Sequence, residues 1–493
     1  MKIFRWLPMV FLIACSAADS YPGPGPGGNN GQPPGGNVSF GGGGDFAAFR
    51  QALDSGRIPL PETIEPTGFF AEHHTTLPAP TCGDRLCLHA MLSVAPDLVK
   101  GGVKTLLQLG VNTPLDPDTF PRPPLDLVVV VDRSGSMAGE DKITYARDGV
   151  KLLVDELGPS DTLTLIAFDD QVQVLYGPAK VTDRARIKGL VDGLTPGGST
   201  NLHDSLKLAF EKALQGLETS SRRVIFLTDG IATAGLTDSE TILAMARGYV
   251  RRYVQLTTIG LGHDVNLPLL RALAEEGSGN FYFLEEPAAA REVFTRELRF
   301  FVAPIAYDVD VSFTAGSAYD VASLSGSSLW QPITDGGRIQ RPSVYLASRT
   351  DDEPDPDGGR RGGGAALLGE LRVAGDDSPG HRVATASLRY RVPGSSTFES
   401  VSVPVTYGDR PGVCGEEGFS SHAPIAKNAI ILGFYTAFHE ATVLARTDRD
   451  GARAMLERFQ DRIEERLAGS TDDDLQDDLV LLARFIAVLG SAR

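Results

Sequence analysis

Residues 125–137 read LDLVVVVDRSGSM, and this stretch decides the fold class of the central part of the chain. Its first part, residues 125–131, is nearly continuously apolar, which is typical of a central strand buried on both faces of a parallel sheet. Asp132, Ser134 and Ser136 follow at alternate positions on the turn after this strand. In open α/β sheets, ligands bind at the carboxyl ends of the strands. The stretch therefore predicts a buried strand that leads into a binding turn.

The chain around this stretch alternates strands with helices. Strands are predicted at Leu125–Val131, Thr162–Phe168, Val172–Tyr176, Arg223–Leu227, Val254–Ile259 and Phe281–Leu284. The first intervening helix, Ile143 to Leu157, carries apolar residues at three- and four-residue intervals and is therefore amphipathic. Alternation of this kind indicates a mostly parallel sheet covered by helices. We expect a doubly wound α/β domain over residues 124–298.

Two further segments bring oxygen atoms to the same edge of the predicted sheet. The Gly-rich loop 196–201 contains the Thr200 hydroxyl, and the strand Arg223–Leu227 leads into a Thr-Asp-Gly turn that adds the Asp229 carboxylate. Carboxylates and hydroxyls are hard oxygen ligands, which suit Mg²⁺ or Mn²⁺ and are poor ligands for Zn²⁺ or copper. The three segments therefore predict a divalent-cation site.

The motifs Asp-x-Ser-x-Ser, Gly-Gly-x-Thr and Thr-Asp-Gly, in this order and spacing, resemble the metal-ion-dependent adhesion site of von Willebrand factor A (VWA) domains. The residues that match the family's ligand positions are Asp132, Ser134, Ser136, Thr200 and Asp229. The resemblance implies bound Mg²⁺, with Mn²⁺ or Ca²⁺ as alternatives, and direct ligation by the two serines. Thr200 and the aspartates would ligate directly or through water. An acidic residue of a protein partner would complete the coordination.

The same resemblance has consequences for the architecture. It implies the strand order 3-2-1-4-5-6, with the strand Val172–Tyr176 antiparallel at one edge. The sequence on either side of the α/β domain resembles that of bacterial VWA lipoproteins with their own N- and C-terminal flanking domains. We therefore expect flanking domains that are specific to such a family.

Residues 1–15 indicate export and a lipid anchor. Two basic residues precede a short apolar stretch, which is typical of a secretion signal and is too short to cross a bilayer. Residues 12–15 (LIAC) resemble a lipobox, the site where bacterial lipoproteins are cleaved and the cysteine, here Cys15, is lipidated. Ser16 follows, which favours the outer membrane by the sorting rule of such proteins. We expect a lipid-anchored protein of the bacterial cell envelope, with its domains in the periplasm or at the cell surface.

The flanks of the α/β domain differ from it in pattern. Residues 16–45 are dominated by Gly and Pro and predict a disordered linker with a mean reach of roughly 30 Å. Residues 46–123 begin with a helix and continue into strand-like segments. Residues 303–410 alternate apolar and polar positions, which predicts a β-sandwich, completed by those earlier strands. Within it, residues 350–364 are acidic and Gly-rich and predict a mobile loop. Residues 424–493 predict a C-terminal helical domain.

The cysteines indicate one disulfide bond. Cys82 and Cys87 frame the short loop Gly-Asp-Arg-Leu, whose glycine allows the tight turn that such a loop needs. Exported chains oxidise suitable pairs, so we expect these two cysteines to be bonded. Cys414 is then left free. No second closely spaced pair is present to complete a zinc tetrad, so no zinc is predicted.

Several classes of function are disfavoured. The net charge is -17 and no basic run with interleaved aromatic residues occurs, so nucleic acid is not an expected partner. The chain contains no Gly-x-Ser-x-Gly, P-loop or His-Glu-x-x-His motif. An aspartyl-phosphate enzyme would need a second Asp at the position of Ser134. His73 and His74 are expected in surface or packing roles, and His203 is expected on the surface of the first turn of a helix. We expect no enzyme.

Three hypotheses for the function remain. The first is divalent-metal-dependent protein binding in adhesion or envelope assembly. The second is a structural or regulatory subunit of an envelope complex, in which the metal only orders loops. The third is a metal-dependent hydrolase, which would need a nucleophile or general base within reach of the metal. A coordination position that faces solvent would favour the first hypothesis, and a buried metal held only by protein would favour the second.

Overall fold

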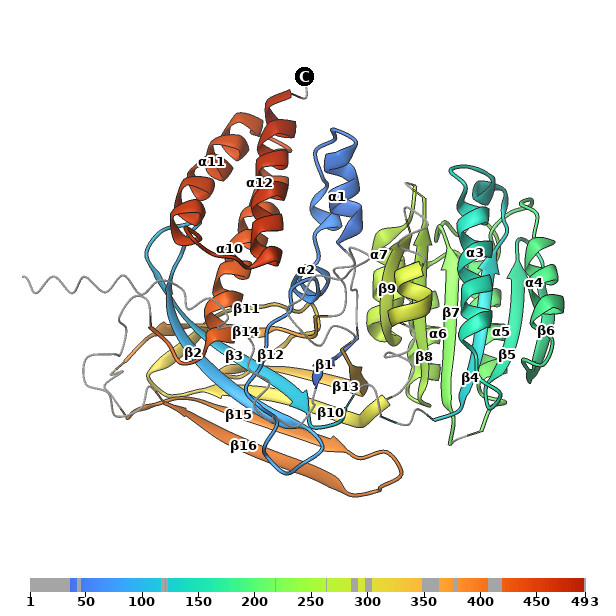
Figure 1. Cartoon of the computed structure of the whole chain (residues 1–493), viewed down its shortest axis with the longest axis horizontal. Coiled ribbons are helices and arrows are strands. Elements are labelled where there is room, and N and C mark those ends of the chain that lie inside the picture. Colours follow the sequence, from blue (N-terminus) through green and yellow to red (C-terminus); the bar gives the residue numbers. More distant parts are fainter. Residues whose placement is uncertain are drawn as a thin grey trace, which may run out of the picture.

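A computed structural model of the chain describes residues 36–41, 46–116, 120, 123–217, 219–262, 264–284, 291–297, 304–347, 363–375, 380–406 and 419–491. The chain forms an α/β domain and a second part, which we call the flanking module and which comprises residues 36–113 and 304–491 (Figure 1). The α/β domain is therefore inserted between two segments of the flanking module.

The α/β domain has the predicted doubly wound architecture. Its strands are β4 (Leu125–Asp132), β5 (Thr162–Phe168), β6 (Val172–Lys180), β7 (Ser221–Thr228), β8 (Val254–Leu261) and β9 (Ser278–Leu284). Its helices are α3 (Lys142–Glu156), α4 (Arg184–Asp192), α5 (Leu202–Ala213), α6 (Ser239–Val250) and α7 (Leu267–Glu276), with short helical turns at η2 (Gly135–Ala138) and η3 (Glu292–Glu297). In the described residues the sheet order is β6-β5-β4-β7-β8-β9, and only β6 runs antiparallel to its neighbour. The predicted strand order 3-2-1-4-5-6 is confirmed.

Strand β4 lies in the middle of this sheet because both of its faces are apolar. Leu127, Val129 and Val131 are buried in a core that also contains residues of α3 and α4. Val128 and Val130 point to the opposite face and are buried against α5, α6 and α7. Since successive side chains of a strand alternate between faces, only a continuous apolar run can supply both cores.

The flanking module is built on an antiparallel sheet. Its strands are β1 (Gly36–Ser39), β2 (Cys87–Pro96), β3 (Val103–Thr113), β10 (Pro304–Ala315), β11 (Tyr319–Ser325), β12 (Gln331–Ile333), β13 (Gly336–Leu346), β14 (Leu367–Val373), β15 (Arg382–Arg391), β16 (Phe398–Thr406) and β17 (Phe419–Ser420). The order along the main path is β11-β14-β3-β1-β13-β10-β15-β16, and β2 pairs with β3. Residues from both halves of this path, such as Leu107 and Val311, share one core. The predicted β-sandwich is therefore a single sheet folded over its own core, and it includes the strands that precede the α/β domain.

The prediction of a disordered linker over residues 16–45 is wrong for its C-terminal part. Residues Gly36–Ser39 form strand β1, which pairs with β3 on one side and with β13 on the other. Val38 and Phe40 are only 1% and 3% exposed. Two apolar side chains at alternate positions are enough to hold this short strand in the core, although glycines surround them in the sequence. Strand β1 thereby joins the two halves of the sheet.

Other predicted features fall wholly or partly outside the described residues. They are residues 1–35 with Cys15, most of the loop 350–364, and Cys414. The last two residues of that loop are described, and Gly363 N–H donates to the carbonyl oxygen of Ala71 at 2.7 Å. Cys82 and Cys87, the pair indicated by the sequence, form a disulfide bond.

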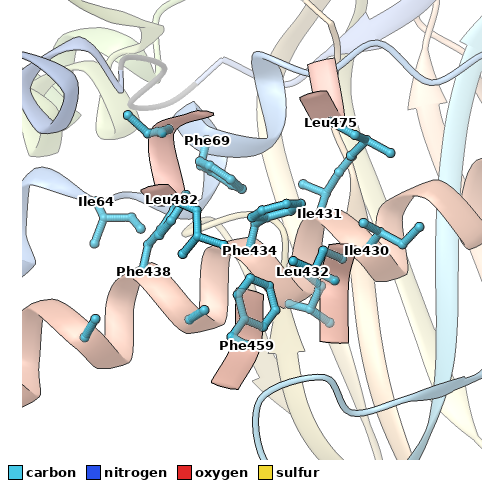
Figure 2. Close-up of a cluster of buried hydrophobic side chains, with 14 of the residues drawn as sticks. Ile64, Phe69, Ile430, Ile431, Leu432, Phe434, Phe438, Phe459, Leu475 and Leu482 are labelled. Carbon is cyan, nitrogen blue, oxygen red and sulfur yellow. The ribbon is translucent and has the colours of Figure 1, made fainter. Parts of the chain in front are cut away.

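The helical part of the flanking module consists of α1 (Ala47–Asp54), η1 (Pro61–Thr63), α2 (Pro66–Ala71), α10 (Ala423–Leu444), α11 (Arg449–Arg466) and α12 (Asp473–Ser491). Figure 2 shows Phe69 of α2, Phe434 and Phe438 of α10 and Phe459 of α11 gathered in one cluster. Leu106 of β3 belongs to the same core, so the helices cover the outer face of the sheet. The apolar run of α10 is used for this packing, and no helix among the described residues has the length and hydropathy to span a membrane.

Buried arginines join the flanking module to the α/β domain. Arg341 of β13 donates to the carbonyl oxygens of Phe40 and Glu275 at 2.9 and 2.5 Å. The guanidinium of Arg223, near the amino end of β7, lies 5.0 Å from the ring centroid of Tyr345. These contacts are at the amino ends of the parallel strands. The flanking module is therefore attached partly at the edge opposite to the predicted metal ligands and partly at α7, where Arg271 donates to the carbonyl oxygens of Glu62 and Thr63.

A buried polar contact joins the N-terminal and C-terminal segments of the flanking module. His73 Nε2 lies 2.8 Å from Asp478 Oδ2, and the two side chains are 0% and 1% exposed. His73 Nδ1 lies 2.9 Å from the carbonyl oxygen of Phe69, which can only accept, so Nδ1 carries a proton. The predicted packing role of His73 is thus the observed one, and the neighbouring His74 is also buried.

We predict that Asp478→Ala lowers the free energy of unfolding of the flanking module by about 3–5 kcal/mol, because it leaves the His73 ring buried without its partner. Asp473→Ala, at an exposed position on the same helix, should cost less than about 1 kcal/mol. Urea denaturation of both variants measures the difference. Equal losses in the two variants would contradict a structural role for the pair.

Candidate metal centre

All five predicted ligands lie on three loops at the carboxyl edge of the parallel sheet. Asp132 ends β4, and Ser134 and Ser136 follow it on the turn that contains η2. Thr200 lies in the loop before α5, and Asp229 directly follows β7. Strands β4 and β7 are parallel neighbours, so their carboxyl ends are adjacent. The fold therefore brings these residues together from three distant parts of the sequence.

Backbone hydrogen bonds fasten the loop after β4 to the loop before α5. Gly197 N–H donates to the carbonyl oxygen of Arg133 at 2.8 Å, and Gly135 N–H donates to that of Gly198 at 3.1 Å. Gly198 has a φ of +75°, and a Cβ there would collide with Asp170. The positive φ at position 198 thus favours glycine, and the missing side chain leaves room for the loop between β5 and β6.

The loop after β7 is fastened to both of the others. Thr200 N–H donates to Thr233 Oγ1 at 2.9 Å, and Thr233 N–H donates back to the Thr200 carbonyl at 3.0 Å. Thr228 Oγ1 donates to Asp132 Oδ2 at 2.5 Å. Each pair of loops is therefore joined directly, and the ligand positions are preorganised by the chain itself.

The Asp132 carboxylate is fully buried and accepts hydrogen bonds on both oxygens. Oδ1 accepts from the Ser134 N–H at 2.8 Å, and Oδ2 accepts from Thr228. Burial raises the pKa of Asp132 to about 6, and the nearby negative charge of Asp229 adds to this increase. The bonds from Thr228 and Ser134 act in the opposite direction, because they stabilise the charged form.

The other ligand candidates differ in exposure. Ser134, Thr200 and Asp229 are buried, whereas Ser136 is exposed. Ser134 Oγ and Ser136 Oγ lie 3.2 Å apart, so the two hydroxyls are adjacent. The site is therefore closed on the side of the sheet and opens to solvent at Ser136.

Two functional side chains of this site were not identified from the sequence. Thr228 belongs to the Thr-Asp-Gly motif, but the motif does not predict its hydrogen bond to Asp132, which depends on the pairing of β4 with β7. Lys142, the first residue of α3, places its ammonium 3.4 Å from Asp229 Oδ2, and both side chains are buried. A lysine ten residues after Asp132 carries no sequence signal of its own, because most lysines at helix ends are solvated.

Two further side chains, Arg133 and His203, lie beside the site. Arg133 pairs with Asp169 at 3.0 Å, as suits a residue at the rim. His203 Nδ1 lies 2.8 Å from Asp204 Oδ1, and its side chain is only 13% exposed. His203 therefore lies in the first turn of α5, as expected, and is partly buried there.

The donor set fits a hard divalent cation. Two buried carboxylates lie close enough for the charge of Asp229 to raise the pKa of Asp132, so the site favours a bound positive charge. The remaining candidate ligands are hydroxyl oxygens, which suit Mg²⁺, Mn²⁺ or Ca²⁺. Asp132 and Asp229 would hold the ion together with Ser134, Ser136 and Thr200. Among the described residues, no cluster of three or more His, Cys, Asp or Glu forms a different metal site.

Comparison with known families agrees with this geometry. The model of the von Willebrand factor type A domain family matches residues 126–296. These residues are a VWA domain. Domains of this family often bind a divalent metal at the adhesion-site motif and mediate protein interactions.

Relatives of the chain match part of its length. The uncharacterized protein YfbK of Escherichia coli K12 is 25% identical over 286 residues, which are 56% of this chain and 49% of that protein. Human inter-alpha-trypsin inhibitor heavy chain H1 is 28% identical over 201 residues, 38% of this chain and 22% of that protein. The chain thus spans about half or less of the length of these relatives.

A solved structure has a similar fold over a longer region. The von Willebrand factor type A protein from Catenulispora acidiphila aligns with a TM-score of 0.54 and 16% identity, covering 81% of this chain and 89% of that protein. This likeness covers far more than residues 126–296, so it extends to the fold of the flanking module.

We predict that Thr228→Val lowers the free energy of unfolding of the VWA domain by about 1–3 kcal/mol in chelator, because it leaves Asp132 Oδ2 and the Gly230 N–H without their buried partner. Valine has the same shape as threonine, so packing is preserved. The control is Thr237→Val on the exposed part of the same loop, which should cost less than about 0.5 kcal/mol. Urea denaturation in EDTA distinguishes them, and equal stability of the two variants would count against the role of Thr228.

Proposed function

We propose that this chain binds Mg²⁺, or alternatively Mn²⁺ or Ca²⁺, at Asp132, Ser134, Ser136, Thr200 and Asp229, and that it uses this site to hold a protein partner. A bound divalent cation would offer a coordination position to a carboxylate of the partner. The proposed role is binding, in adhesion or in envelope assembly, without a catalytic step.

The observation that carries this proposal is the one-sided opening of the site. Four of the five candidate ligands are buried, whereas Ser136 and its neighbour Gly135 are exposed. A site that serves only to order loops would be expected to close over its metal. The exposed side supports a ligand supplied from outside the chain, and so favours a binding role over a purely structural one.

The rim of the site also suits a protein ligand. Ile231 and Leu236, on the loop after β7, are 40% and 51% exposed. This loop is fixed beside the site, since the Thr200 carbonyl accepts from the N–H groups of Thr233 and Ala234, both at 3.0 Å. Exposed apolar side chains next to a polar site provide the contact area that a protein partner needs.

The charges around the site support a partner whose binding depends on the metal. Glu140, Asp170 and Asp204 are exposed carboxylates on the loops that form it or beside them. An acidic side chain of a partner would be repelled by these groups, and a bound divalent cation would reverse the sign of the local charge. Binding of an acidic ligand should therefore require the metal.

The location of the protein is a further part of the proposal. We propose that Cys15 is lipidated and that the chain is anchored in the bacterial envelope, in the outer membrane by the residue that follows Cys15. The sequence of residues 12–15 supports this proposal. Incorporation of a labelled fatty acid, and its loss in Cys15→Ser, checks it.

We predict that Mg²⁺ at about 100 times its Kd stabilises the VWA domain by about 2.7 kcal/mol, as mass action requires for a ligand that binds only the folded state. Asp132→Ala should abolish this increment while the domain stays folded. The exposed Asp170→Ala is the control and should keep it. Urea denaturation with Mg²⁺ or EDTA gives the three increments, and an unchanged increment in Asp132→Ala would rule out the proposed site.

We predict that a chain beginning at Ser16, which keeps strand β1, retains a protein from envelope extract in Mg²⁺ but not in EDTA. Asp132→Ala should retain none in either condition. Leu236→Asp should retain less in Mg²⁺ while its Mg²⁺ affinity is unchanged, because only the rim contact is altered. Equal retention by all proteins in both conditions would favour the structural-subunit hypothesis instead.

A further inference from the structure

Lys142 is buried in a position that helix stability does not explain. It is the first residue of α3, where the helix dipole is positive and disfavours a cation. Its side chain is only 6% exposed, and burying an ammonium is costly unless a negative partner is present. That partner is Asp229, whose Oδ2 lies 3.4 Å from Lys142 Nζ and whose side chain is 0% exposed.

The chain around Lys142 is shaped to direct its side chain into the site. Glu140 and Asp141, just before it, have φ values of 53° and 54°, a left-handed conformation that is unfavourable for residues other than glycine. Gly262 lies against the lysine stem, and a Cβ at that position would collide with Lys142 Cε. Two residues with positive φ therefore precede Lys142, and the glycine at position 262 leaves room for its stem beside a candidate metal ligand.

We infer that Lys142 is an internal counter-cation that compensates the buried carboxylates of the metal site and competes with a divalent cation for Asp229. This inference rests on the proposed function, because it concerns the same five ligands. Without a divalent ion, the ammonium balances part of the charge of Asp132 and Asp229 and keeps the site folded. With the ion, Asp229 is shared between two cations, so Lys142 lowers the affinity for the metal.

The local geometry offers the ammonium a second acceptor. The position that a Gly262 Cβ would occupy is 2.8 Å from Glu140 Oε2 and also contacts Lys142 Cε, so the Glu140 carboxylate lies beside the lysine stem. Glu140 is exposed, whereas Asp229 is buried. A lysine that leaves Asp229 therefore has a carboxylate within the same turn. Lys142 sets the metal concentration at which the site becomes occupied, and so the concentration at which a partner is held.

The test compares Lys142→Met, which keeps the stem and removes the charge, with the control Lys151→Met. Lys151 is also on α3 and pairs with Asp148 and Asp192 at 2.9 and 3.0 Å, but its side chain is 29% exposed and it has no contact with the site ligands among those described. The Kd for Mg²⁺ and Mn²⁺ is measured by calorimetry, and the urea midpoint is measured in EDTA and in saturating Mg²⁺.

Lys142→Met should bind Mg²⁺ at least about tenfold more tightly than the wild type, because the competing buried charge is gone. Its urea midpoint should fall in EDTA and recover in Mg²⁺, whereas Lys151→Met should match the wild type in affinity. Lys142→Gln, which can still donate to Asp229, should also bind more tightly, and it replaces the Met variant if that variant does not fold in EDTA.

Two outcomes would overturn the inference, and they differ from each other. Wild-type or weaker affinity in the folded Lys142 variants would overturn it while leaving the proposed metal site intact. Failure of the wild type and the variants alike to bind either ion would overturn the proposed function and this inference together.

Discussion

The hydrogen bond from Thr228 Oγ1 to Asp132 Oδ2 joins the ends of two neighbouring parallel strands, and the geometry of the site depends on it. It holds a fully buried carboxylate in one orientation and satisfies one of its oxygens. The Gly230 N–H donates to the same threonine oxygen, which sets the start of the following loop. Once β4 and β7 are paired in this way, Asp229 and the Thr200 loop have little freedom left.

The negative charge of two buried carboxylates explains the arrangement of charged groups around this hydrogen bond. Asp132 and Asp229 are buried together, and buried carboxylates need a positive charge nearby to balance them. The chain supplies one of its own, Lys142, and leaves the exposed side near Ser136 open. A divalent ion bound at the proposed site would balance the remaining negative charge. The partner's carboxylate then adds to a site that would otherwise repel it.

The VWA domain is inserted into the flanking module and carries its candidate site at the carboxyl ends of its strands. The module contacts the domain through Arg223 and Arg341 at the amino ends of the strands and through Arg271 of α7, whereas the candidate metal ligands follow the carboxyl ends. Residues before and after the inserted domain share one antiparallel sheet, so both connections of the domain lead back to the same body (Figure 1).

The sequence by itself determined the elements whose signals are local. The apolar run of β4, the hydroxyl and carboxylate motifs and the Cys82–Cys87 loop are each contained in a few neighbouring residues, and alternation over longer stretches indicated the helices and most strands. Strand β1 was missed because two apolar residues, Val38 and Phe40, stand in a Gly-rich segment whose composition indicates disorder. Only pairing with β3 and β13, which are distant in sequence, makes it a strand.

Tertiary structure alone decided the contacts that compensate buried charge. Lys142 meets Asp229 across 87 positions of sequence, and His73 meets Asp478 across 405. The local sequence around a lysine or a histidine does not predict such a partner, because either side chain can equally well remain solvated at the surface. Sequence motifs can predict the oxygen ligands of a metal site, because these ligands must lie on turns of defined length. The counter-charges can come from anywhere that the fold brings into contact, because Coulombic attraction depends on distance in space and not on separation along the chain.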